Sequence, residues 1–331
     1  EQLGLRIACA EDVFVHHNLS SSFNKLKSRE RQALFTKNKA VYEAKWGKWI
    51  PHVYRESART IPPPFRGFEH ILGRCNVCGN TARFFFKEAA LWRESLACEH
   101  CRSTSRYRSI ARGILRAVGD LSGVRASSLA SLRRTGVQKR LHVYDTQPPF
   151  YADACSYPLP DLLKASGWVD LELSFFKPKK KLGAKLAPGI TNQNLETLTF
   201  GDETFDIVVT SDVMEHVRLD LNAHREIHRV LRPGGIYLFT VPHSRERLET
   251  LVRVQVVDPA DSAKDVHLLE PEFHGDTNSD SGERALSYRV YGRDLEETLQ
   301  ALGFEVEYFR DDIPENGILN TELYYCRKVR V

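Results

Sequence analysis

The spacing of four cysteines indicates chemistry more clearly than any other pattern in this chain. They form two C-x-x-C pairs, CNVC and CEHC, with nineteen residues between them. Two such turns can direct four thiolates at one ion, which is the tetrahedral shell that Zn²⁺ prefers in structural sites. A full thiolate shell leaves no open position for water or substrate. The pattern therefore predicts a structural zinc rather than a catalytic one, held by Cys75, Cys78, Cys98 and Cys101.

A second group of reactive side chains, Asp212, Glu215 and His216, lies in the stretch SDVMEHV. It directly follows the apolar run FDIVVT, which is typical of a buried strand. Carboxylates and imidazoles exchange protons or hold cations, and the ligands of open α/β sheets bind outside the carboxyl ends of the strands. The stretch therefore predicts a functional site at the end of this strand.

The elements that must position these residues form two groups. Between the cysteine pairs, the sequence predicts strands of a small ribbon that needs the metal for stability. From about residue 140, short apolar strands alternate with helical patterns, which predicts a parallel sheet covered on both faces. We expect strands at 140–145, 167–174, 205–210, 236–242, 304–309 and 322–328, and helices at 219–231 and 293–303.

A further helix is expected over 103–119, directly after the second cysteine pair. Ser103 or Thr104 can cap it, and Ile110 and Ile114 have helical spacing. Its arginines are expected to form a solvated face or to pair with carboxylates, namely Arg102, Arg106, Arg108 and Arg112.

The long run from Asn194 to Pro242 resembles the central part of class I S-adenosylmethionine (SAM)-dependent methyltransferases of the type-11 kind. The order of elements extends this resemblance over roughly residues 140–328. It implies an α/β fold with a Rossmann-like, doubly wound, seven-stranded sheet whose last strand is antiparallel, and with SAM lying across the strand ends. The cysteine pairs ahead of it, and the later segment LLEPEFHGD, resemble zinc-ribbon methyltransferase-like proteins.

The resemblance also assigns residues to the cofactor. Such enzymes usually carry a glycine-rich loop after the first strand, whereas LHVYDTQPPFYADA has no glycine, so we expect a different loop geometry. The resemblance places Asn194 and Leu195 near the adenine, and Ser211 and Asp212 beside the methionine moiety. It places Tyr144 and Asp145 at the end of the first strand, and either Asp170 or Glu172 at the ribose hydroxyls.

Transfer of a methyl group to a hydroxyl requires a group that accepts the proton, and histidine titrates in the useful range. The candidates are His216, His243 after the neighbouring strand, and His274 on a long loop. Each is alternatively a hydrogen-bonded structural histidine. In a further alternative, Asp212 or Glu215 holds a divalent metal that orients sugar hydroxyls.

The first part of the chain fits neither module. Residues 12–55 resemble the C-terminal edge of a family 2 glycosyltransferase of the GT-A fold, and a proline-rich linker follows. The expected organisation is a glycosyltransferase-like segment at 1–57, a linker at 58–70, a zinc ribbon with its helix at 71–118, a linker at 119–139 and the methyltransferase-like domain at 140–331.

This arrangement predicts a SAM-dependent O-methyltransferase that modifies a sugar hydroxyl in surface glycan or polysaccharide biosynthesis. The expected partners are a carbohydrate acceptor, as a glycan or a nucleotide- or lipid-linked sugar, and an upstream glycosyltransferase domain or protein. The alternatives are a catalytically degenerate methyltransferase fold that binds a partner or glycan, and a methyltransferase for another small molecule or RNA.

Composition argues against nucleic-acid-binding, membrane-spanning and disulfide-rich proteins. A net charge of +4 over 331 residues, without a concentrated basic face, argues against a dedicated nucleic-acid binder. No apolar run approaches the roughly 20 residues that a membrane-spanning helix needs. The odd number of cysteines argues against a disulfide framework, so we expect a cytoplasmic protein.

Overall fold

The computed structural model describes residues 69–86, 92–135, 140–147, 159–275, 284–310 and 312–329, together with positions 37, 40 and 44. Apart from those three positions, the described residues lie in one compact unit, Ser57–Val331. The predicted glycosyltransferase-like segment and nearly all of the predicted linker at 58–70 lie outside the described residues. The same holds for positions 148–154 of the glycine-free loop.

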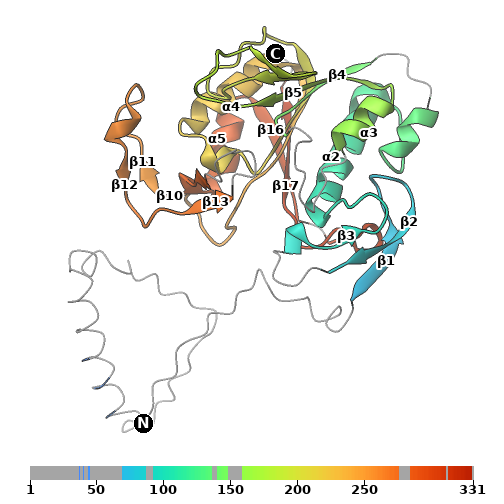
Figure 1. Ribbon diagram of the computed structural model, residues 1–331, viewed down its shortest axis with the longest axis horizontal. Coiled ribbons are helices and arrows are strands. Elements are labelled where there is room, and N and C mark those ends of the chain that lie inside the picture. Colours follow the sequence, from blue (N-terminus) through green and yellow to red (C-terminus); the bar gives the residue numbers. More distant parts are fainter. Residues whose placement is uncertain are drawn as a thin grey trace. The chain divides into compact units, whose positions relative to one another are not determined.

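A mixed eight-stranded sheet organises this unit (Figure 1). Its strands are β4 (Leu141–Asp145), β5 (Val169–Phe175), β6 (Lys185–Ala187), β7 (Ile190–Asn192), β8 (Phe205–Ser211), β9 (Leu231–Thr240), β16 (Phe304–Phe309) and β17 (Leu323–Lys328). They are arranged in the order β16-β17-β9-β8-β4-β5-β7-β6. From β9 to β7 neighbouring strands are parallel, and β17 is antiparallel to both of its neighbours. The predicted seven strands and antiparallel last strand are present, and the short β6 is added at one edge.

Helices cover both faces of the sheet, as Figure 1 shows. On one face α2 (Ser105–Ser122) packs on β9 and β17, and α3 (Leu159–Ala165) packs on β5. On the other face α4 (Asp220–Val230) packs on β9 and α5 (Asp294–Ala301) on β16. Successive strand residues alternate between the two cores, so that Val143 belongs to the α2 side and Tyr144 to the α4 side. The doubly wound arrangement follows from this alternation.

The turn between α4 and β9 differs from the prediction. The helix was expected over 219–231 and the strand over 236–242, with RPGG between them. Instead α4 ends at Val230 and the extended chain begins at once, with a register shift against β8. A Cβ on Gly235 would lie 2.9 Å from the carbonyl oxygen of Arg232 and 3.1 Å from that of Asp206, so only glycine lets this stretch lie directly against β8.

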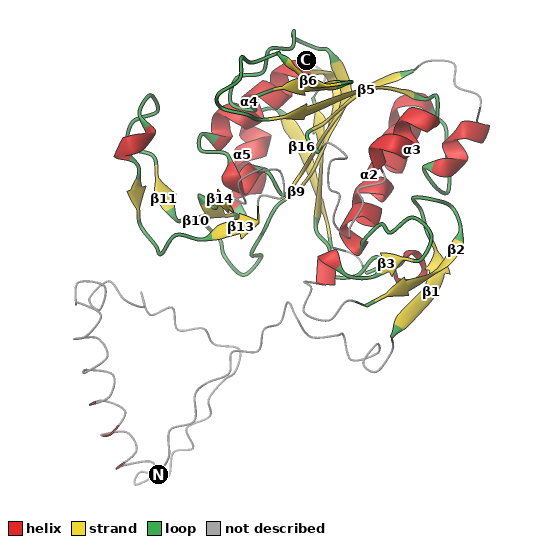
Figure 2. Cartoon of the chain, viewed as in Figure 1, coloured by secondary structure: helices red, strands yellow, loops and turns green. Residues whose placement is uncertain are grey.

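The cysteine pairs lie in a three-stranded antiparallel sheet formed by β1 (His70–Arg74), β2 (Thr81–Phe85) and β3 (Ala97–Cys98) (Figure 2). Phe84 of this small sheet belongs to the same hydrophobic core as Ile110 of α2 and Leu238 of β9. A Cβ on Gly73 would lie 2.3 Å from the carbonyl oxygen of Glu315, because the loop before β17 packs directly against β1. The small sheet is therefore built onto the large one through a shared core.

Three short two-stranded antiparallel sheets lie between β9 and α5. They pair β10 (Leu251–Val252) with β15 (Arg289–Val290), β11 (Val254–Gln255) with β12 (Val266–His267), and β13 (Phe273–Gly275) with β14 (Arg284–Leu286). The backbone N–H of Tyr288 donates to the carbonyl oxygen of Glu215 at 2.8 Å, which ties this region to the end of β8. No helix among the described residues is long and apolar enough to cross a membrane.

Candidate active site

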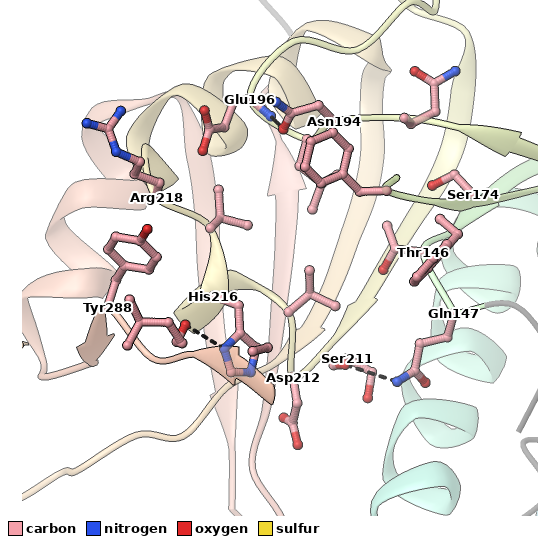
Figure 3. A pocket seen from close by; sticks show the side chains of 18 of the residues that line it. Thr146, Gln147, Ser174, Asn194, Glu196, Ser211, Asp212, His216, Arg218 and Tyr288 are labelled. Carbon is pink, nitrogen blue, oxygen red and sulfur yellow. Dashed lines mark hydrogen bonds between the residues drawn. The ribbon is translucent and has the colours of Figure 1, made fainter. Parts of the chain in front are cut away.

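A cavity of about 640 Å³ opens at the carboxyl ends of β4, β5 and β8 (Figure 3). This is where parallel α/β sheets bind their ligands, and the volume is in the usual range of small-molecule sites. Among the residues that line it are Thr146 and Gln147 after β4, Ser174, Phe175 and Phe176 at the end of β5, Asn194, Leu195 and Glu196 after β7, and Ser211, Asp212 and His216 after β8.

The predicted cofactor residues divide into two groups. Asn194, Leu195, Ser211 and Asp212 line the cavity, as the resemblance implied. Tyr144 does not line it, because its ring is buried in the core and its hydroxyl forms a hydrogen bond of 2.6 Å with the hydroxyl of Ser174.

Three predicted acids also lie away from the cavity lining. Asp145 is fully buried, and its carboxylate accepts from the N–H of Gln147 at 2.9 Å. Asp170 pairs with Arg140 at 3.1 Å, and Glu172 is exposed on the same strand. Both lie too early in β5, because its carboxyl end is Phe175.

Sequence reasoning missed Gln147, Phe175 and Glu196. Gln147 donates from Nε2 to the carbonyl oxygen of Ser211 at 3.1 Å, as Figure 3 shows. Its Oε1 is buried without a hydrogen-bond partner among the described residues, so it lacks a donor that a ligand can supply. For Gln147 and Phe175 the available signal was a position just after a predicted strand, whereas the strand before Glu196, β7, was not predicted.

Asp212 adopts a left-handed conformation, with φ of 50°, and forms the centre of a charged cluster. Arg93 donates to its Oδ1, Thr240 donates to the same oxygen at 2.9 Å, and Nη1 of Arg106 lies 3.3 Å from Oδ2. Burial would raise the pKa of Asp212, but the guanidinium groups of Arg93 and Arg106 hold it at about 2. The carboxylate is therefore charged and engaged, and is not available as a base.

The arginines of this cluster come from the cysteine-bearing module. Arg93 lies in the 3₁₀ helix η3 (Trp92–Glu94), and Arg106 lies in the first turn of α2. Arg106 also pairs with Glu94 at 2.5 Å and donates to the Ser211 hydroxyl at 2.5 Å. The expected pairing with carboxylates is thus found for Arg106, while the alternative of a solvated face is wrong, because its side chain is almost completely buried.

Beside the cavity, Glu215, His216 and His274 come together. Glu215 and His216 lie in the 3₁₀ helix η5 (Met214–His216), and His274 lies in β13. Oε1 of Glu215 is 3.6 Å from Nε2 of His216 and 3.8 Å from Nδ1 of His274. Burial, and then the charge of Asp212, raise the pKa of Glu215 to about 8. The structure therefore unites two predicted candidate bases around a buried carboxyl group.

His243, the third candidate base, has a different setting. Its Nε2 lies 3.0 Å from the carbonyl oxygen of Gly292, and its ring packs against Tyr308 and Tyr324. It does not line the cavity. Burial lowers its pKa. These contacts are those of a hydrogen-bonded structural histidine.

The four cysteine sulfurs converge as a zinc site requires. Sγ of Cys75 lies 3.7 Å from that of Cys101, Sγ of Cys78 lies 3.9 Å from that of Cys98, and all four lie within 4.8 Å of one another. Zn–S bonds of about 2.3 Å in a tetrahedron place neighbouring sulfurs about 3.8 Å apart. The donor set and its spacing therefore fit Zn²⁺.

Arg108, expected as a solvated or carboxylate-paired arginine, is instead fully buried beside this cluster. Its guanidinium donates to the carbonyl oxygens of Leu96 at 2.6 Å and Gly317 at 2.8 Å and lies over the ring of Phe84. Burial lowers the pKa of Arg108 to about 10, and the nearby thiolates oppose this. It links the cysteine module to the loop before β17.

The residues that form this site overlap a match to a known family of domains. Residues 169–239 match the sequence model described as "Methyltransferase domain". They span β5, β8, α4 and nearly all of β9, and include most of the cavity lining. This part of the chain is therefore similar to a methyltransferase domain.

Other comparisons are weaker. No curated protein matches the chain. Among solved structures, a SAM-dependent methyltransferase from Methanosarcina mazei is 13% identical, with 59% of this chain and 95% of that one covered and a TM-score of 0.35. A Mesorhizobium loti SAM-dependent methyltransferase is 18% identical, with 60% and 97% covered and a TM-score of 0.34.

A Burkholderia thailandensis 1,6-didemethyltoxoflavin-N1-methyltransferase, with bound substrate and S-adenosylhomocysteine, is 13% identical. The match covers 75% of this chain and 96% of that one, with a TM-score of 0.35. Similarities of this size carry no argument about the acceptor of this methyltransferase domain.

Proposed function

We propose that the protein is an O-methyltransferase that transfers the methyl group of SAM to a sugar hydroxyl. The observation that carries this proposal is the position of Glu215, His216 and His274. His216 lines the cavity together with the candidate cofactor contacts Asn194 and Asp212, and Glu215 and His274 lie directly behind it. A hydroxyl acceptor needs basic groups at the transfer point, and this cluster supplies them.

The cavity residues fit the cofactor. Asn194, Leu195 and Phe175 would hold its nucleoside, and Ser211 and Gln147, whose buried Oε1 lacks a donor, would hold its methionine moiety. The bound cofactor supplies an activated methyl group on a sulfonium. The protein must then align the acceptor oxygen and accommodate the proton that the hydroxyl loses.

Two features support a carbohydrate as the acceptor class. The segment at 12–55 resembles the edge of a family 2 glycosyltransferase, and a methyltransferase fused to such a domain would act on the sugar that it adds. The net charge of +4 is too small to favour RNA. We further propose that Cys75, Cys78, Cys98 and Cys101 bind a structural Zn²⁺ that braces the arginine-bearing module.

Methyl transfer from radiolabelled SAM to glycans, nucleotide-linked sugars and RNA tests this function. His216→Ala and His274→Ala should each reduce transfer by about 10²-fold or more, because each removes a group from the transfer point, while cofactor affinity stays within a few-fold. His142→Ala is the matched control, since its side chain is 43% exposed on β4.

Unchanged turnover in both variants would show that the cluster takes no part in the reaction. Labelling of RNA in preference to every sugar would replace the proposed acceptor. A folded protein that labels no acceptor would favour the alternative of a binding module.

A further inference from the structure

Three potential metal ligands converge next to the cavity. Glu215, His216 and His274 each offer one ligand atom, and these three atoms all lie within 4.8 Å of one another. A tetrahedral ion with bonds of about 2.1 Å places neighbouring ligand atoms about 3.4 Å apart, and the two distances to Glu215 are 3.6 and 3.8 Å. The two distances to Glu215 are thus within a few tenths of an ångström of those in such a site.

Hydrogen bonds orient both histidines for ligation. Nδ1 of His216 lies 2.9 Å from the carbonyl oxygen of Leu286, which can only accept, so the proton of the neutral ring is on Nδ1 and the lone pair is on Nε2. Nε2 of His274 lies 3.0 Å from a carboxylate oxygen of Glu272, which places the lone pair of that ring on Nδ1. Both lone pairs are therefore on the nitrogens nearest Glu215. Such second contacts are typical of metal-binding histidines.

Glu215 provides an independent sign of a missing ion. Its side chain is fully buried, and neither carboxylate oxygen has a hydrogen-bond partner within the described part of the chain. A buried carboxylate without donors is costly unless a cation compensates it. The arginines nearest to this region are already engaged, since Arg93 and Arg106 pair with Asp212.

The surrounding backbone holds the ligands in place. The guanidinium of Arg289 donates to the carbonyl oxygens of Val217 at 2.5 Å and Arg218 at 2.9 Å, which fixes the chain after η5. His274 is positioned by the pairing of β13 with β14, and Leu286 of β14 is the residue that holds His216. The site is thus preorganised by two elements that are distant in sequence.

We propose that Glu215, His216 and His274 bind a divalent first-row transition metal ion whose open coordination position faces the cavity. Two imidazoles and one carboxylate suit such ions, and three protein ligands with one open position are typical of catalytic sites. His216 is also part of the cavity lining. Resting on the proposed function, the ion would bind the acceptor hydroxyl and lower its pKa, so that the hydroxyl proton is released to water and the histidines act as ligands rather than as free bases.

This assignment separates two alternatives that the sequence left open. Asp212 and Glu215 were both considered as ligands for a divalent ion. Asp212 is neutralised by two guanidinium groups, whereas the carboxylate of Glu215 lies beside two imidazoles. Glu215, rather than Asp212, is therefore the carboxylate ligand of the proposed metal site.

Binding of Co²⁺ to the zinc-loaded protein tests the inference without any methyl transfer. Wild-type protein should bind one Co²⁺ per chain beyond its zinc, measured by calorimetry and by the visible absorption of the ion. Glu215→Gln and His274→Ala should abolish this binding, and Glu272→Gln should weaken it about tenfold, because Glu272 only orients His274. His142→Ala should bind Co²⁺ like the wild type.

The outcomes of these experiments test the metal site and the proposed function separately. No additional Co²⁺ on folded wild-type protein, or equal binding by Glu215→Gln, would overturn the metal site. If methyl transfer were observed in that case, the proposed function would stand without the metal. If Co²⁺ bound as expected but no acceptor were methylated, the metal site would stand and the proposed function would fail.

Discussion

At the scale of single residues, the charges around the end of β8 divide into two groups with different roles. Asp212 is permanently ionised and held by Arg93 and Arg106. Glu215, only three positions further along the chain, is buried without a hydrogen-bond partner among the described residues. The first carboxylate is therefore held in the cavity lining by ion pairs, and the second is the one that we propose as a metal ligand.

The first group predicts a stability effect. Asp212→Asn should lower the free energy of unfolding by roughly 3 kcal/mol, because two largely buried guanidinium groups lose one counter-ion and keep only Glu94. Asparagine tolerates the left-handed conformation, so backbone strain is not a confounding cause.

Chemical denaturation measures this effect, and Asp170→Asn is the matched control. Asp170 pairs with Arg140 at an exposed position, and its loss should cost less than about 1 kcal/mol. Equal costs for the two variants would contradict the structural role of the Asp212 cluster.

His224 predicts a pH dependence. It is buried between Tyr237 and Phe239, and burial lowers its pKa to about 4. Between pH of about 6.5 and 4 the unfolded chain binds a proton that the folded chain does not, so stability falls as the pH falls through this window, by up to roughly 3 kcal/mol.

Denaturation at pH 7, 5.5 and 4.5 tests this. His224→Leu should lose less stability than the wild type between pH 6.5 and 4, and the two proteins should have the same pH dependence above pH 7. A variant with the full wild-type loss on acidification would show that His224 is not the group responsible.

At the scale of elements, the cysteine module contributes directly to the cavity. The 3₁₀ helix η3 and the start of α2 carry Arg93 and Arg106 to Asp212. Arg108 of the same helix joins Leu96 to Gly317. The module and the sheet therefore act as one structural unit at this site.

Loss of zinc should consequently weaken cofactor binding. Cys98→Ser, or removal of zinc by a chelator, should lower the melting temperature by about 10 °C or more and weaken SAM binding about tenfold or more, because the arginines lose their support. Cys9→Ser is the control. Unchanged SAM affinity in protein shown by elemental analysis to lack zinc would contradict this coupling.

The elements themselves could be predicted from the sequence, because β4, β5 and β8 are short apolar runs and α4 has a clear helical period. The burial of Arg106 and Arg108 could not. Their partners Ser211 and Gly317 lie 105 and 209 positions away, and a helical pattern contains no information about such contacts.

The site was predictable to a similar extent. Ser211, Asp212 and His216 follow a recognisable strand, so their place at its carboxyl end could be expected. The approach of His274 depends on the pairing of β13 with β14, which short strands do not specify in advance. Asp170 and Glu172 were misplaced because an alternating pattern does not fix where a strand meets its ligand.

At the scale of the whole molecule, the described residues of 57–331 combine the eight-stranded sheet, a cysteine module that shares its core, and the β13–β14 pair that brings His274 to Glu215. The cavity of about 640 Å³ has room for a cofactor together with part of an acceptor. All three parts converge on the ends of β4, β5 and β8.

Calorimetric titration of the zinc-loaded protein with SAM and S-adenosylhomocysteine tests the central claim most directly. We expect one binding site per chain with micromolar affinity for each, weakened in Gln147→Ala because that residue lines the cavity. Absence of binding up to millimolar concentration, with the protein shown to be folded, would contradict the assignment of this cavity to the cofactor.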